Sequence, residues 1–167
     1  MLTLAVIALI LIGLCVGLAV RLWTAPKWVD VETPGCTIKF PRQPVREMSL
    51  APDPWAGARM HVYKVELPDA VFQLDEIETD ASAVTNADLA RFIVATSAAL
   101  NGTLHPQSRP SDFRIQLNDG SVVHGRVYAS RAQGRTFRLL VAKPATSVTE
   151  SLDEMLFLDS FLPRAKF

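Results

Sequence analysis

The sequence has few of the residues on which several protein classes depend. It contains only two cysteines in 167 residues, Cys15 and Cys36, which excludes a disulfide framework within a small domain. Lys and Arg together number 17, as do Asp and Glu, so the chain lacks the basic excess typical of a nucleic-acid binder. We therefore expect no nucleic-acid partner.

Motifs for catalysis, metal binding and phosphate binding are also missing. The three histidines, His61, His105 and His124, show no H-x-x-x-H spacing, and the 8 glycines are scattered rather than gathered in a phosphate-binding loop. We predict no metal site, no cofactor and no catalytic residue. The expectation that follows is that the protein is not an enzyme.

One long apolar segment is present at the N-terminus. Residues 1–20 contain no charged side chain, and 12 of them are Leu, Ile or Val. A helix of this length is roughly 30 Å long, which matches the hydrocarbon thickness of a bilayer. No Lys or Arg precedes the apolar run, and no suitable small-x-small site follows it, so we predict a retained signal-anchor over residues 1–22 rather than a cleaved signal. The protein is therefore expected to be located in a membrane, which it crosses once.

Amphipathic and basic residues follow this span, as expected at a membrane–water interface. They are Arg21, Trp23, Lys27 and Trp28. The positive-inside rule favours the cytoplasm for the domain beyond them. Within the span, Gly13 and Gly17 form a G-x-x-x-G pattern, which either allows two helices to dimerise or reflects the general abundance of small residues in membrane helices. The partners implied are the lipid bilayer, a protein at the membrane and a second copy of the chain.

The rest of the chain predicts one α+β domain over residues 35–163, after a linker over residues 23–34 that contains Pro26 and Pro34. Alternating apolar residues predict strands, with a proline-rich loop over residues 41–57. The strands expected are 36–40, 58–67, 71–79, 113–117, 122–130 and 136–143. A 3.6-residue period predicts a helix from about Asn86 to Leu100, and a capping-box spacing at Ser147 predicts a final helix before Pro163.

Short segments of this domain resemble the PsbP-like family, the type of the photosystem II extrinsic subunit P. The opening run T-P-G-C-T-I-K-F-P-R-Q-P at residues 33–44 is similar to the first strand of such domains. Further matches are G-R-V-Y at 125–128, the strand at 137–141 and F-L-D-S-F at 157–161. The resemblance covers residues 33–162 and implies an α-β-α sandwich without a shared catalytic site, which works as an assembly factor or a binding module.

Charges are segregated along the chain although they sum to zero. Seven acids and no Lys or Arg lie between Lys64 and Arg91, whereas five basic residues and no acid lie between Asp119 and Glu150. The basic residues are Arg126, Arg131, Arg135, Arg138 and Lys143. If the two segments form neighbouring strands, cross-strand ion pairs stabilise the sheet. If they occupy separate faces, the basic residues form a docking surface for an acidic protein or for anionic lipid headgroups.

Three functions are compatible with the sequence. The first is a membrane-anchored, non-catalytic interaction or assembly module, which the resemblance favours. The second is a small-ligand-binding domain with a groove between sheet and helix. The third is an enzyme of unrecognised type, which would need titratable side chains clustered in that groove.

Overall fold

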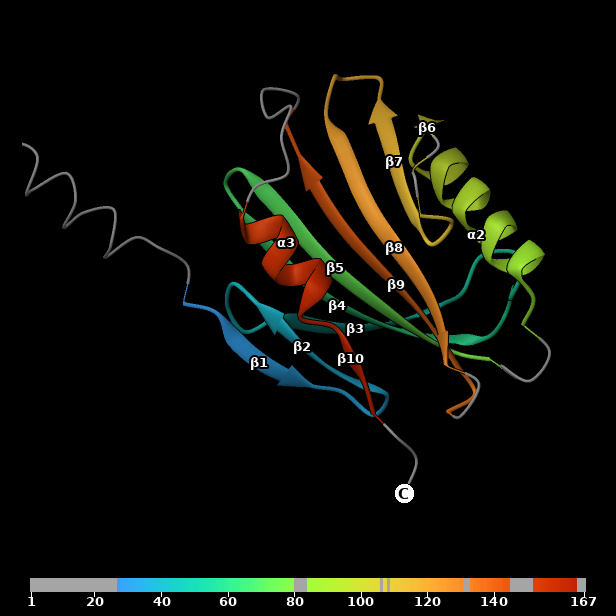
Figure 1. Cartoon of the computed structure of the whole chain (residues 1–167), viewed down its shortest axis with the longest axis horizontal. Helices are drawn as coiled ribbons and strands as arrows, with labels where there is room; N and C mark the ends of the chain where they lie inside the picture. The colour runs from blue at the N-terminus through green and yellow to red at the C-terminus, as the bar shows by residue number, and fades with distance from the viewer. Residues whose placement is uncertain are drawn as a thin grey trace, which may run out of the picture.

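The computed structural model describes residues 27–79, 84–105, 107, 109–130, 133–144 and 152–164. Its main element is a seven-stranded sheet in the order β3-β4-β5-β9-β8-β7-β6, in which every neighbouring pair is antiparallel. The strands are β3 (Val45–Leu50), β4 (Arg59–Leu67), β5 (Ala70–Glu78), β6 (Gly102–His105), β7 (Asp112–Leu117), β8 (Val122–Ser130) and β9 (Arg135–Lys143). Figure 1 shows this sheet as the centre of the domain.

Two different layers cover the faces of this sheet (Figure 1). Helix α2 (Asn86–Ala99) packs on one face. The other face is covered by helix α3 (Leu152–Asp159) and by a small sheet in the order β1-β2-β10. The strands of the small sheet are β1 (Val29–Glu32), β2 (Cys36–Phe40) and β10 (Leu162–Pro163).

The predicted α-β-α sandwich is therefore wrong. The described residues form a mostly β structure with two antiparallel sheets, ten strands and two short helices. The prediction failed because the small sheet draws on segments that lack a strong signal. Val29–Glu32 pairs with β2 although it falls in the predicted linker, and β10 has only two residues, one of them a proline.

The structure also corrects the prediction of a single-pass membrane protein, for the residues that it describes. Within those residues no helix is long and apolar enough to cross a bilayer. Helix α2 has 14 residues and α3 has 8, whereas a span needs about 20. The predicted anchor, residues 1–22 with Gly13 and Gly17, lies outside the described residues.

Several predicted elements are confirmed. The hairpin of β4 and β5, the three-stranded unit of β7, β8 and β9, and strand β2 all lie within a residue or two of the predicted bounds. Helix α2 begins at a capping box, because the Thr85 hydroxyl accepts from the Asp88 N–H while the Asp88 carboxylate accepts from the Thr85 N–H. Strands β3 and β6 fall in segments predicted as loop or connection.

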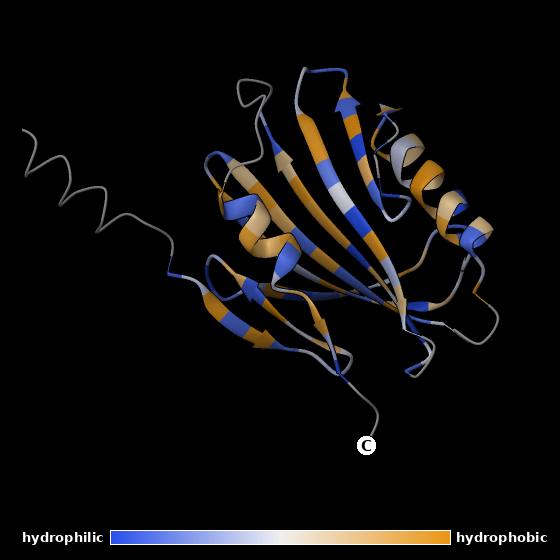
Figure 2. Ribbon diagram, in the orientation of Figure 1, coloured by the Kyte–Doolittle hydropathy of each residue, from blue (hydrophilic) through white to orange (hydrophobic). Residues whose placement is uncertain are grey.

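Hydrophilic and hydrophobic residues alternate along strands of the large sheet (Figure 2), and its buried apolar side chains form two cores, one on each face. On β5, Phe72 and Leu74 point toward α3 and the small sheet, where edge-on ring contacts join Phe72 to Phe157 at 5.5 Å and Phe157 to Phe40 at 5.1 Å. Each such side chain stabilises the fold by about 1.5–3 kcal/mol through burial. The ring contacts contribute about 0.5–1.5 kcal/mol more. They fix α3 over β5 and β9, so the same face of β7 and β8 is covered only in part.

A buried ion pair connects α2 to the centre of the sheet. Arg138 on β9 donates to the Asp75 carboxylate on β5 at 2.6 Å and to the Thr96 hydroxyl on α2 at 2.7 Å. The guanidinium carbon also lies 4.8 Å from the centre of the Phe92 ring. Asp75 is fully buried and accepts a further hydrogen bond from Gln73. This network fixes α2 in position by directional contacts rather than by apolar packing alone.

Removing one partner of this pair should destabilise the domain strongly. Asp75→Ala leaves the Arg138 charge buried without its anion, so the free energy of unfolding in urea should fall by about 3–5 kcal/mol. The double variant Asp75→Leu with Arg138→Met should recover most of that loss. As a control, Asp30→Ala removes the exposed Lys39–Asp30 pair and should cost at most about 1 kcal/mol. If Asp75→Ala also lowered the free energy of unfolding by at most about 1 kcal/mol, the role assigned to the ion pair would be contradicted.

Candidate functional site

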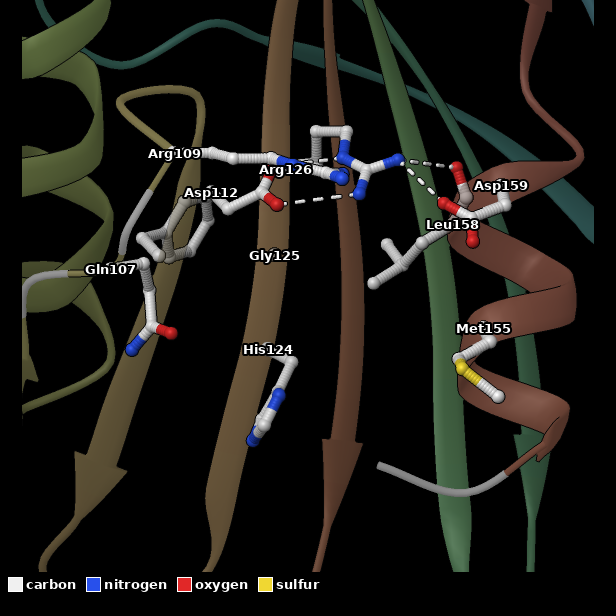
Figure 3. A pocket seen from close by; sticks show the side chains of 10 residues that line it. Gln107, Arg109, Asp112, His124, Gly125, Arg126, Met155, Leu158 and Asp159 are labelled. Atoms are coloured by element: carbon white, nitrogen blue, oxygen red, sulfur yellow. Dashed lines mark hydrogen bonds and ion pairs between the residues drawn. The ribbon is translucent and has the colours of Figure 1, made fainter. Parts of the chain in front are cut away.

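A groove lies on the uncovered part of the large sheet, between α3 and strands β7 and β8 (Figure 3). Its cavity has a volume of about 360 Å³. The lining residues come from the connection before β7, from β7 and β8, and from the last turns of α3. They are Gln107, Arg109, Asp112, Phe113, His124, Gly125, Arg126, Met155, Leu158 and Asp159.

Gly125 lines the groove with its backbone, and its position in β8 admits no side chain on the opposite, α2-facing side of the sheet. The Phe113 ring of β7 crosses Gly125 so closely that a Cβ atom there would lie 2.2 Å from the ring. Only glycine permits this approach without a shift of the ring. The Phe113 ring is thereby held in the core on the α2 side of the sheet.

Arg126 joins the two walls of the groove. Its Nε donates to Asp112 at 2.8 Å, and its Nη1 donates to the Asp159 carboxylate at 3.0 Å and to the Leu158 carbonyl at 3.1 Å (Figure 3). The hydrogen bond with Asp112 raises the pKa of Arg126 above its usual range, against the opposing effect of partial burial. Arg126 is thus a structural clamp between the start of β7, β8 and the end of α3.

A second charged cluster lies at the other end of α3. The Glu154 carboxylate is buried, lies 2.7 Å from Nδ1 of His124 and lies 3.4 Å from Nζ of Lys143. Burial raises the pKa of Glu154, but the hydrogen bond and charge of His124, together with Lys143, outweigh it and hold this pKa below its ordinary value. The cluster fixes one ring edge of His124 and directs the imidazole into the groove.

The predicted basic residues do not lie on one surface. Arg138 faces α2, whereas Arg126, Arg135 and Lys143 face the side of α3, and Arg131 lies outside the described residues. Arg135 lies 2.7 Å from the buried Glu76 carboxylate and 3.9 Å from Glu78. Because β5 and β9 are neighbours in the sheet, Arg135 and Arg138 form cross-strand ion pairs with the acidic segment. A docking role for the five basic residues stays a prediction.

Of the predicted membrane-interface residues, Lys27 and Trp28 lie in the described part of the chain, and Arg21 and Trp23 do not. The Trp28 ring packs edge-on against Phe72 at 5.9 Å and belongs to the core under the small sheet. Lys27 is exposed. Trp28 therefore has a packing role in the domain.

Strand β3 is a second candidate site, and it was not predicted from the sequence. All six of its residues are exposed, including Val45, Met48 and Leu50 at 64–68%. It is an edge of the large sheet, and no described strand pairs with its outer side. Prolines on both sides of it favoured a loop, although residues 45–50 themselves contain none. The absence of proline from residues 45–50 was the feature of the sequence that could have indicated a strand.

Comparison of the chain with known protein families, with characterised proteins and with solved structures gives no match. The resemblance to PsbP-like domains therefore stays a prediction. No cluster of three or more His, Cys, Asp or Glu side chains suited to a metal ion occurs among the described residues. The candidate sites in the described structure are the groove and the edge strand β3.

The charge cluster around Glu154 should contribute to acid sensitivity. Because the pKa of Glu154 in the folded protein lies below its ordinary value of 4.5, its ion pairs stabilise the fold above that pH, and this contribution is lost as the pH falls through the folded value. Glu154→Gln should lower the midpoint of thermal unfolding at pH 7 and reduce the difference between pH 7 and pH 3. Thermal unfolding followed by circular dichroism at pH values from 3 to 7 measures this difference in melting midpoint. An unchanged difference would argue against the cluster.

Cys36 should be inert in the folded protein. It is fully buried and contacts the Thr33 hydroxyl, and burial raises the pKa of its thiol to about 12. At pH 8 only about one thiol in ten thousand is then ionised, so a thiol reagent should react no faster than the protein unfolds. The Cys15→Ser variant isolates Cys36 for a colorimetric thiol assay with and without urea. Rapid labelling without urea would contradict this expectation.

Proposed function

We propose that the protein is a non-catalytic protein-interaction module that binds an extended segment of a partner protein along β3. The bound segment adds one antiparallel strand to the large sheet. The observation that carries this proposal is the full exposure of β3 along one edge of the sheet. An exposed edge strand presents unpaired backbone N–H and C=O groups, which are a template for strand addition.

The side chains of β3 suit a partner rather than solvent. Natural edge strands are often protected by lysine, proline or a bulge, and β3 contains neither residue type. Its register with β4 places Met48 and Leu50 on one face, opposite His61 and Arg59. A partner strand with apolar residues on that face would cover both side chains. Arg46 and Glu47 leave the strand without net charge, so backbone pairing meets no repulsion of one sign.

The opposite edge of the sheet offers less exposed backbone for the addition of a strand. Strand β6 has four residues, and α2 packs beside it. At the start of β3, in contrast, a cavity of about 460 Å³ is lined by residues of β3, β4 and the turn before β3, including Val45, Glu47 and Lys64. One side chain of an added strand would fit there.

Lysine substitutions on β3 test the proposal. Peptides of eight residues selected from a random display library should protect β3 amides from hydrogen exchange when bound. Met48→Lys with Leu50→Lys should weaken their binding at least tenfold, because charged edge residues oppose strand addition. The matched control is Val94→Lys with Leu152→Lys, which replaces two apolar residues of similar exposure on the helices.

The proposal fails if selected peptides protect other amides and leave β3 unchanged, or if the double variant and the control bind equally well. Circular dichroism of both double variants at equal concentration checks that each remains folded. Since β3 residues are exposed, we expect melting temperatures close to that of the unsubstituted chain.

A further inference from the structure

A row of basic side chains crosses the groove face of β6, β7 and β8. The register places His105 opposite Arg114, and Arg114 opposite His124. Residues directly opposite in antiparallel strands point to the same face, with Cβ atoms about 4.5–5.5 Å apart. Because His124 contacts Glu154 on α3, this face is the one that α3 covers in part. We call His105, Arg114 and His124 the basic row.

The acids around the groove already have basic partners, one of which is His124 of the basic row. Asp112 and Asp159 both bind Arg126, and Glu154 lies between His124 and Lys143. Arg109, in contrast, is exposed at the rim of the cavity, and no described residue forms an ion pair with it. Arg109 thus lacks a counter-ion among the described residues, although the formal charges that line the cavity, Arg109 and Arg126 with Asp112 and Asp159, sum to zero.

Arg114 does not line the cavity itself, but it lies opposite His124, which does, and it adds a positive charge beside the groove. Its Nε is shielded from solvent, and no described residue accepts a hydrogen bond from it. No acid in the described part of the chain forms an ion pair with its guanidinium group. A shielded charged donor without an acceptor is unfavourable, and a bound anion would supply the acceptor.

We propose that this groove binds a small organic phosphate monoester, with its phosphate on Arg114 and His124 and with Arg109 closing over it from the rim. Arginine presents a planar set of donors that matches the oxygens of a phosphate. Two guanidinium groups without counter-ions among the described residues favour a dianion over a monocarboxylate. The cavity of about 360 Å³ is within the range of small-molecule sites, and Met155 and Leu158 on α3 offer apolar contact for the organic part (Figure 3). This site is separate from β3 and does not depend on the proposed function.

Phenyl phosphate is the probe. In calorimetric titrations of the full chain it should bind saturably, and binding should weaken as salt rises. Arg114→Gln and Arg109→Gln should each reduce affinity about tenfold or more, since each removes a charge-assisted contact. The control Arg59→Gln, an exposed arginine on β4, should bind as the unsubstituted chain does. Amide shifts in NMR spectra should be largest in β7, β8 and α3.

Benzoate and inorganic phosphate test the chemical class. Benzoate should bind at least tenfold more weakly than phenyl phosphate, and inorganic phosphate should also bind more weakly because it lacks the apolar contact. The proposal is overturned if phenyl phosphate shows no saturable binding, or if Arg109→Gln binds as tightly as Arg59→Gln. Equal affinity for benzoate would overturn the choice of phosphate, and equal affinity for inorganic phosphate would overturn the organic ligand. Arg109 is exposed, so its variant stays informative even if Arg114→Gln fails to fold.

Discussion

The position of α2 on the sheet depends on the buried ion pair between Arg138 and Asp75. The pair joins the two central strands of the sheet and, through Thr96 and the Phe92 ring, holds α2 against them. Two charges taken out of water are tolerated only where geometry and further hydrogen bonds compensate, and here Gln73 and Thr96 supply those bonds. Because such contacts are directional, they define one position for α2, whereas apolar packing alone tolerates several. The helix in turn covers the face behind β7 and β8, so the groove has a rigid floor.

Strand pairing in the large sheet explains why acidic and basic residues are separated along the sequence. The acidic segment and the basic segment meet as neighbours, β5 and β9, and their charges are largely used within the fold. The same strand β9 sends Arg138 to one face and Arg135 to the other, where Arg135 binds Glu76 beneath the small sheet. Gly35 of the turn before β2 allows that close approach, since a Cβ atom there would lie 2.6 Å from the Glu76 carboxylate. What remains for a ligand is the charge on β7 and on the connection before it.

Strong periodicity predicted much of this structure. The helix at residues 86–99 and the long strands have clear periods and caps or turns at their ends, and these are local properties. The small sheet was not predictable in this way, because pairing of Val29–Glu32 and of Leu162–Pro163 with β2 joins distant segments. The same limit applied to the groove. Arg126 and Lys143 were recognised in the sequence as basic residues. The sequence alone could not place Arg109, Arg114 and Glu154 near one another, because strand register and the position of α3 bring these residues together.

The two edges of the large sheet are unequal, and this inequality sets how far assembly can proceed. Growth of a sheet into a fibre requires that each added strand present a new edge and that both ends accept strands. Here one end is the long exposed β3 and the other is the four-residue β6 beside α2. Strand pairing at β3 therefore uses up the one long edge that the described sheet offers. If a partner strand adds to β3 as proposed, the unequal edges would favour a closed one-to-one pair over open-ended growth.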